Sequence, residues 1–176
     1  MRHSLFACVP FVLAIAVPAL AAESDAEFVD KTANVGMLEV ELGRYASQHA
    51  ASPSVRSFGQ QMVADHSKAN VELNAIAQRS GLTVPAALDA EHKNELDKLT
   101  KKTGSDFDKA YMEMMVDGHT DTVQSFRDQA KEAKTEVDRF AAKTLPTLEK
   151  HLSQAKSIQD NLQAKSDAAG HSHAAR

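Results

Sequence analysis

One glutamate and three histidines are the residues of this sequence best suited to chemistry. Glu39, His66, His119 and His151 lie 13 to 16 residues after the starts of four long predicted helices. At about 1.5 Å of rise per residue, each lies roughly 20–24 Å along its helix, near the middle. Helices that pack side by side therefore bring the four side chains into one layer. Imidazole and carboxylate groups bind Fe, Zn, Cu or Mn, so the spacing predicts a site for a single transition-metal ion.

The four side chains are also predicted to face the core. Each follows an apolar residue by three or four positions, which places both on one helix face; these apolar residues are Val35, Met62, Met115 and Leu148. Asp65, about 100° around the helix from His66, and Tyr111, two turns before His119, are expected to support the ligands from outside the metal shell. The alternative is a buried polar network that fixes helix register without any metal.

A carboxylate-bridged pair of iron ions is disfavoured by the sequence. Such sites in helical bundles take Glu from two helices and a Glu-x-x-His motif from each of the other two. Here the residues three positions before the histidines are Val63, Val116 and Leu148. The sequence therefore favours one ion held by three imidazoles and Glu39.

The segments that must position these residues are helical. Residues Ser24-Asp25-Ala26-Glu27 form a capping box, which begins a first helix that ends near His49. Ser52 as N-cap and Pro53 in the first turn begin a second helix, which is expected to end near Ser80 because Gly81 follows. Apolar residues recur at helical spacing through both segments.

Two further long helices are predicted to begin near Ser105 and Thr135. The connection between the second and third long helices, residues 82–104, is long and carries a short polar helix over about 89–102. Two hairpins with tight turns and a long crossover are typical of one class of four-helix bundle. The predicted fold is therefore all-α, a ferritin-like four-helix bundle of two antiparallel helical hairpins, with one short extra helix in the crossover.

Composition narrows the classes of function. The chain has 20 Lys and Arg against 24 Asp and Glu, a formal net charge of −4, which excludes a protein that grips nucleic acid mainly by charge. Hydrophobic residues make up 43% of the chain and aromatic residues 5%, which suits a helical core. No catalytic motif occurs, and this favours a binding or structural role over catalysis.

The first 21 residues are predicted to be a cleaved signal peptide. An apolar run from Leu5 to Leu20 ends in Ala19-Leu20-Ala21, which supplies the small residues of a cleavage site. Cleavage removes Cys8, the only cysteine, so thiol and disulfide chemistry are excluded. The mature chain is expected in the periplasm or outside the cell, without membrane insertion, as a bundle domain over 22–163 and a disordered, His-containing tail over 164–176.

Four motifs carry a resemblance to a known family: Met37 to Gly43, Met62 to His66, Ala110-Tyr111 with His119, and Leu145 to Leu152. Together they resemble the bacterial domain-of-unknown-function family 4142, over a stretch from about Glu27 to Leu162. The resemblance implies a ferritin-like four-helix fold and export from the cytoplasm. It implies no activity.

Two functional hypotheses follow from the residues. The first is an exported bundle that binds one transition-metal ion, for sequestration or simple redox chemistry. The second is a non-enzymatic helical module of the envelope or of a stress response, which binds a protein partner or a second copy of itself and in which the polar layer is purely structural. An iron oxidase of the di-iron kind ranks last because the carboxylates are missing.

Overall fold

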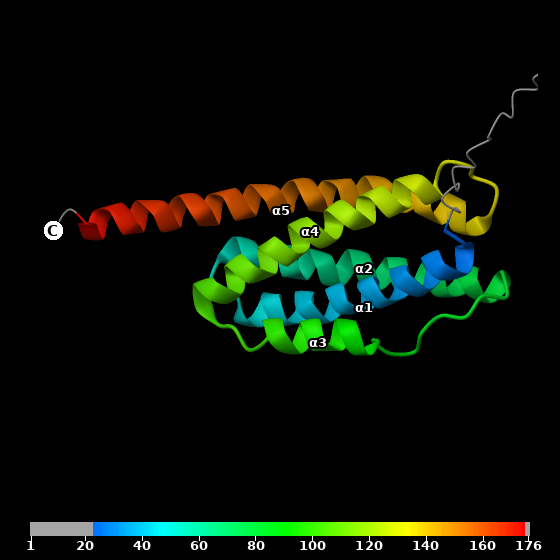
Figure 1. Ribbon diagram of the computed structural model, residues 1–176, viewed down its shortest axis with the longest axis horizontal. Helices are drawn as coiled ribbons and strands as arrows, with labels where there is room; N and C mark the ends of the chain where they lie inside the picture. Colours follow the sequence, from blue (N-terminus) through cyan, green and yellow to red (C-terminus); the bar gives the residue numbers. More distant parts are fainter. Residues whose placement is uncertain (1–22, 175–176) are drawn as a thin grey trace, which may run out of the picture.

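The computed structural model describes residues 23–174, and these residues form five helices and no strand. The helices are α1 (Asp25–His49), α2 (Pro53–Arg79), α3 (Ala90–Leu99), α4 (Gly104–Gln129) and α5 (Glu136–Ala174). The four long helices run side by side, and the short α3 lies along α1 (Figure 1). The prediction of an all-helical bundle with a short helix in the crossover is confirmed. No helix in the described part of the chain has the length and apolarity needed to cross a membrane.

The start of α1 follows the predicted capping box. The Ser24 hydroxyl accepts a hydrogen bond from the Glu27 backbone N–H at 3.3 Å, and the Glu27 carboxylate accepts one from the Ser24 backbone N–H at 3.0 Å. This reciprocal pair satisfies two backbone donors that a helix start leaves free.

The start of α2 differs from the predicted cap in one respect. Pro53 occupies the first turn as predicted, but the Ser52 side chain makes no capping hydrogen bond. Instead, the buried carboxylate of Asp108 on α4 accepts the backbone N–H groups of Ala51 at 2.9 Å and Ser52 at 2.7 Å. A carboxylate from the second hairpin thus holds the turn of the first.

The two hairpins, α1 with α2 and α4 with α5, pack against each other chiefly through α2 and α5. Within the first hairpin, the helices approach closely where two glycines meet. A Cβ atom on Gly43 would lie 2.8 Å from the Gly59 carbonyl oxygen, and a Cβ on Gly59 would lie 2.8 Å from the Gly43 carbonyl oxygen. Only glycine at both positions permits this backbone contact.

Helix α3 is shorter than the predicted 89–102 and ends at Leu99. The Asp89 carboxylate caps its start by accepting the His92 backbone N–H at 2.9 Å, and the Asp89 backbone N–H donates to the buried Asn34 side chain of α1 at 3.1 Å. At the other end, the Tyr45 hydroxyl donates to the Thr100 carbonyl at 2.9 Å. Both ends of α3 are therefore fixed to α1.

The last helix is longer than the sequence predicts. The expected disordered tail over 164–176 is helical as far as Ala174, and Figure 1 shows this end of α5 extending past the other helices. Residues 159–168 contain no Pro or Gly, and six of the ten are Ala, Gln, Leu or Lys, which favour continuation of a helix. The Lys109 ammonium also donates to the Ser166 hydroxyl at 3.0 Å. The predicted signal peptide, 1–21, lies outside the described residues.

The core consists of two apolar clusters. One is centred on Leu42, Met62 and Tyr111, near α3, and the other on Phe28, Leu73 and Phe140, toward the opposite end of the bundle. Four buried polar residues belong to neither cluster and lie between them: Glu39, His66, His119 and His151. The predicted polar layer is therefore present at mid-bundle.

Candidate metal centre

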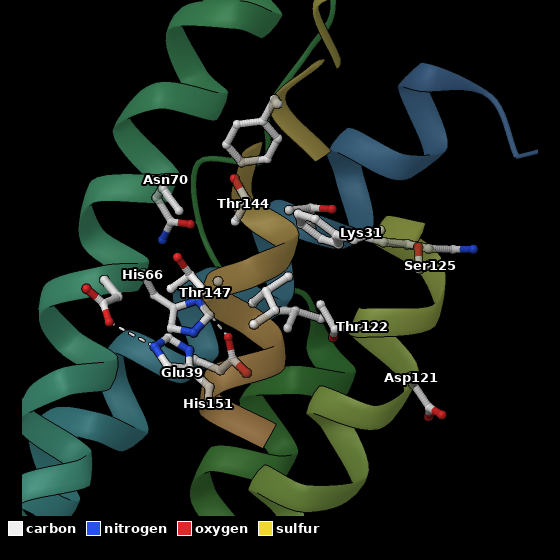
Figure 2. A pocket seen from close by; sticks show the side chains of 18 residues that line it. Lys31, Glu39, His66, Asn70, Asp121, Thr122, Ser125, Thr144, Thr147 and His151 are labelled. Carbon is white, nitrogen blue, oxygen red and sulfur yellow. Dashed lines mark hydrogen bonds and ion pairs between the residues drawn. The ribbon is translucent and has the colours of Figure 1, made fainter. Parts of the chain in front are cut away.

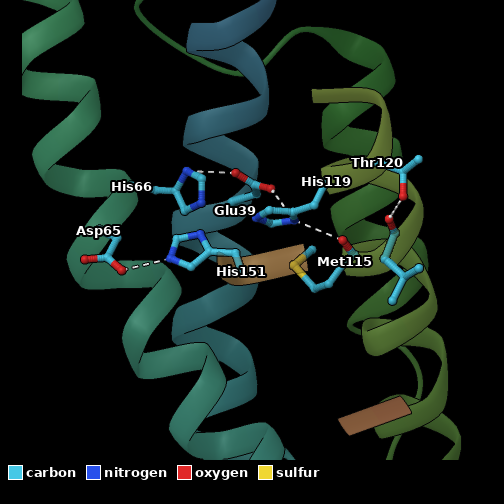
Figure 3. A network of polar contacts seen from close by, with 8 residues as sticks. Glu39, Asp65, His66, Met115, His119, Thr120 and His151 are labelled. Atoms are coloured by element: carbon cyan, nitrogen blue, oxygen red, sulfur yellow. Dashed lines mark hydrogen bonds and ion pairs between the residues drawn. The ribbon is translucent and has the colours of Figure 1, made fainter. Parts of the chain in front are cut away.

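Each long helix contributes one residue to the buried polar layer. Glu39 comes from α1, His66 from α2, His119 from α4 and His151 from α5. All four are buried, with exposed fractions of 3%, 6%, 0% and 0% respectively. Figure 3 shows their side chains converging in the bundle interior. The ring centroids of the three histidines are 5.4–5.7 Å apart, so the imidazoles form a nearly equilateral triangle.

Glu39 holds two of the three imidazoles by their Nδ1 atoms. Its Oε2 lies 2.8 Å from His66 Nδ1, and its Oε1 lies 3.4 Å from His119 Nδ1. His119 Nδ1 also lies 2.9 Å from the Met115 carbonyl oxygen. Because each of these Nδ1 atoms faces oxygen acceptors, it must carry the proton, and the lone pair of the neutral ring is then on Nε2.

His151 is held in the opposite tautomer. Its Nε2 lies 2.8 Å from Asp65 Oδ2, so Nε2 donates and the lone pair is on Nδ1. Asp65 lies at the edge of the layer, with its side chain 39% exposed, while the His151 side chain is fully buried. The predicted role of Asp65 beside the layer agrees with this contact.

The second nitrogen of each ring has no partner among the described residues. His66 Nε2, His119 Nε2 and His151 Nδ1 are all buried and make no hydrogen bond. One ring nitrogen from each histidine lies within 4.8 Å of the other two. Buried polar atoms are nearly always satisfied, so three unsatisfied nitrogens in one place require an explanation. A single metal ion bound by the three nitrogens would satisfy all of them.

The ionisation states follow from burial and from Glu39. Burial disfavours the charged form of Glu39, but the charge of His66 and the contact with it outweigh burial and lower the Glu39 pKa to about 2. Burial acts to lower the pKa of His66, yet the Glu39 charge outweighs it and the pKa is raised. The two shifts are in the directions that the attraction between the Glu39 carboxylate and the His66 imidazole produces.

The other two histidines are held neutral. Burial lowers the pKa of His119, and the nearby His66 lowers it further. Burial also lowers the pKa of His151 to about 4, although the hydrogen bond that His151 donates to Asp65 opposes the shift. A neutral imidazole is the form that binds a metal.

Two of the predicted site residues have contacts that bear on their expected roles. Glu39 belongs to the layer and its carboxylate faces the Nδ1 side of two rings, while the group of converging ring nitrogens comes from the three histidines; metal ligation by Glu39 stays a prediction. The Tyr111 hydroxyl is buried and has no hydrogen-bond partner in the described part of the chain, so it does not support His119 in this way. The Tyr111 ring instead stacks on Phe107, with centroids 5.6 Å apart and an interplanar angle of 9°.

One supporting group was not predicted from the sequence. The Met115 carbonyl belongs to the turn preceding His119, and any helix presents a carbonyl at that position, so no residue type signals the contact. The Met-x-x-x-His spacing does indicate that Met115 and His119 share a helix face.

Solved structures of two other proteins are similar to this chain. A DUF305 fragment from Deinococcus radiodurans has 14% sequence identity and a TM-score of 0.66, with 78% of this chain and 95% of that chain covered. A DUF305 protein from Streptomyces coelicolor, described as a candidate secreted protein, has 14% identity and a TM-score of 0.63, with 81% and 96% covered. At this identity, the similarity shows the helical-bundle fold alone.

The sequence comparisons identify the family. No curated protein matches the chain. The profile of the domain of unknown function DUF4142 matches residues 12–158, which is most of the sequence and spans all four residues of the polar layer. This chain belongs to the DUF4142 family.

Proposed function

We propose that this chain is an exported, ferritin-like helical bundle that binds one transition-metal ion through His66 Nε2, His119 Nε2 and His151 Nδ1. The observation that carries the proposal is that these three buried nitrogens lack partners while ring nitrogens of the same histidines converge within 4.8 Å. Metal–nitrogen bonds of about 2.1 Å place the ligand atoms roughly 3.5 Å apart. Binding therefore requires the rings to close in by about 1 Å, which small side-chain rotations allow.

The contacts around the histidines support ligation rather than a purely structural layer. Metal-bound imidazoles usually donate their other N–H to a carboxylate or a backbone carbonyl, which fixes the tautomer. All three histidines have such a contact, from Glu39, Met115 or Asp65. A layer that served only register would be expected to pair its polar atoms with one another.

The donor set favours some metals over others. Three imidazoles suit Zn, Cu and Fe, whereas Mn prefers oxygen ligands. Because the Glu39 carboxylate faces ring nitrogens, it supplies no ligand oxygen, and Mn becomes the weakest of the four candidates. A di-iron centre is not proposed, since the two carboxylates that contact the layer in the described part of the chain, Glu39 and Asp65, both face imidazoles.

Export and the ferritin-like arrangement are the two remaining parts of the proposal. Export to the periplasm or beyond follows from the predicted signal peptide over 1–21, and one structurally similar DUF305 protein is described as a candidate secreted protein. The ferritin-like arrangement is supported by two helical hairpins and a long crossover with a short helix.

The test is the metal content of the exported protein, purified without chelator. We expect about one equivalent of metal per chain after loading with Zn²⁺, and loss of that equivalent in His119→Ala because the ion then keeps only two ligands. His49→Ala, at an exposed position on α1 outside the layer, is the matched control and should retain the metal.

The alternative function, a helical interaction module with a structural polar layer, gives a different result in the same experiment. The native chain would then hold no stoichiometric metal. His119→Ala would lower the free energy of unfolding by about 1–3 kcal/mol because Glu39 and Met115 lose a buried partner.

A further inference from the structure

A pocket between the four long helices reaches the proposed metal centre from one side. The pocket has a volume of about 180 Å³, and Glu39, His66 and His151 line it at one end (Figure 2). It continues along the bundle toward Phe126 and Phe140. Exposed Lys31 of α1 and Asp121 of α4 line its edge, so it opens to solvent between these two helices.

The walls of this pocket combine an apolar surface with a few hydroxyl groups. Apolar side chains come from every long helix: Val35, Ala69, Phe126, Phe140 and Leu148. Thr122 and Thr147 add hydroxyls near the histidine end. Small-molecule sites typically have this character, with mostly apolar walls and a small number of placed polar groups.

The metal centre leaves a coordination position for such a molecule. Three protein ligands are typical of metal sites that keep a fourth position open for water or substrate. The Glu39 and Asp65 carboxylates are engaged with imidazoles, so neither is free to fill that position. Because neutral imidazoles do not cancel the charge of a divalent ion, the ion itself is the positive centre that an anionic oxygen binds at the open position.

We propose that the pocket binds a small organic anion, whose apolar body lies against Ala69, Phe126 and Phe140 and whose anionic oxygen occupies the open position of the metal. This inference rests on the proposed metal site and deepens it. The volume limits the size of the molecule, because cavities of about 150 Å³ accept benzene. A carboxylate on a single ring or a short chain fits the pocket, and benzoate is the probe of this class.

The experiment uses the full exported chain loaded with Co²⁺, whose visible absorption reports a change of ligand. Titration with benzoate should give a saturable spectral change, and benzoate should bind at least about tenfold more tightly than acetate because its ring is buried in the pocket. Ala69→Phe fills the pocket from α2 without replacing a metal ligand and should abolish the preference for benzoate. Ala64→Phe, at an exposed position on the same helix, should retain it.

Cobalt stoichiometry and helix content are measured on every variant, and Thr122→Leu, which fills the pocket from α4, serves as a second variant if Ala69→Phe does not fold. Equal affinities of the native chain for benzoate and acetate would overturn the inference and leave the metal site standing. The same conclusion would follow if a variant with a filled pocket folded, bound cobalt and still preferred benzoate. Failure of the native chain to bind cobalt would overturn both.

Discussion

At the scale of single residues, Glu39 decides the chemical state of the polar layer. It is buried, it stays ionised because of the His66 charge, and it faces the protonated nitrogens of two imidazoles. A carboxylate in this position increases the donor strength of the rings and fixes their orientation toward a metal. Glu39 is therefore expected to control metal affinity without being a ligand.

Replacement of Glu39 tests this role. Glu39→Gln keeps the size of the side chain but removes its charge, so we expect metal affinity to fall about 10–100-fold with stoichiometry unchanged. The measurement is competition for Zn²⁺ against a chelator of known affinity. Glu41→Gln, on an exposed part of the same helix where Glu41 pairs with Arg44 at 2.8 Å, is the control. Complete loss of stoichiometric binding in Glu39→Gln would instead make Glu39 a ligand, and unchanged affinity would remove it from the site.

At the scale of helices, backbone contact between α1 and α2 sets the spacing of the first hairpin. Gly43→Ala would place a Cβ atom 2.8 Å from the Gly59 carbonyl, which the backbone cannot avoid without moving the helices apart. We expect a loss of about 1–3 kcal/mol in the free energy of unfolding, measured by urea denaturation. Gly118→Ala is the matched control: no atom lies within 4 Å of its added Cβ, so it should stabilise the protein by about 0.5–1 kcal/mol. Equal effects from both substitutions would argue against the close approach.

The start of α5 depends on a buried carboxylate. Asp138 accepts hydrogen bonds from the Lys134 and Thr135 backbone N–H groups at 2.7 and 2.9 Å, and the Thr135 hydroxyl accepts the Asp138 N–H at 3.0 Å. Burial acts to raise the Asp138 pKa, but these hydrogen bonds and that from Gln129 outweigh it and lower the pKa below its ordinary value near 3.8.

A lowered pKa in the folded state makes this stabilisation dependent on pH. It is present above the pKa of the unfolded chain and is lost as the pH falls through the lower pKa of the folded chain. Asp138→Asn should therefore cost about 1–3 kcal/mol at pH 7 and much less near pH 2, as measured by urea denaturation at both values. Asp160→Asn, at an exposed position of α5, should cost little at either pH. If the loss of stability in Asp138→Asn did not change with pH, the ionised Asp138 carboxylate would not be the source of the stabilisation.

At the scale of the whole molecule, local signals in the sequence predict the helices well. Capping residues, helix-breaking residues and apolar spacing act within a few positions, so the starts of α1 and α2 and the mid-bundle layer follow directly from the sequence. The continuation of α5 was missed because the polar composition of 164–176 indicates low burial rather than the absence of a helix. The carboxylate that holds the turn before α2 was also missed, since Asp108 lies 56 residues from Ser52 in sequence.

The candidate site shows the same limit. Spacing predicts which four residues meet, because residues at equal heights on parallel or antiparallel helices share a layer. Spacing does not predict which ring nitrogen each carboxylate faces, since that depends on side-chain rotation and on helix packing. The contacts of the Glu39 carboxylate with His66 and His119, on which our proposal for its role rests, could therefore not be predicted. The pocket beside the layer depends on the packing of all four helices and carries no sequence motif.

The central claim is that three imidazole nitrogens, one each from α2, α4 and α5, bind one metal ion. X-ray absorption spectroscopy of the zinc-loaded chain tests it most directly, because it reports the number and type of atoms around the metal. The account predicts three imidazole nitrogens at about 2.0–2.1 Å with one further light atom, and the loss of this signature in His119→Ala. A shell of oxygens without the imidazole pattern, or a shell unchanged in His119→Ala, would contradict it.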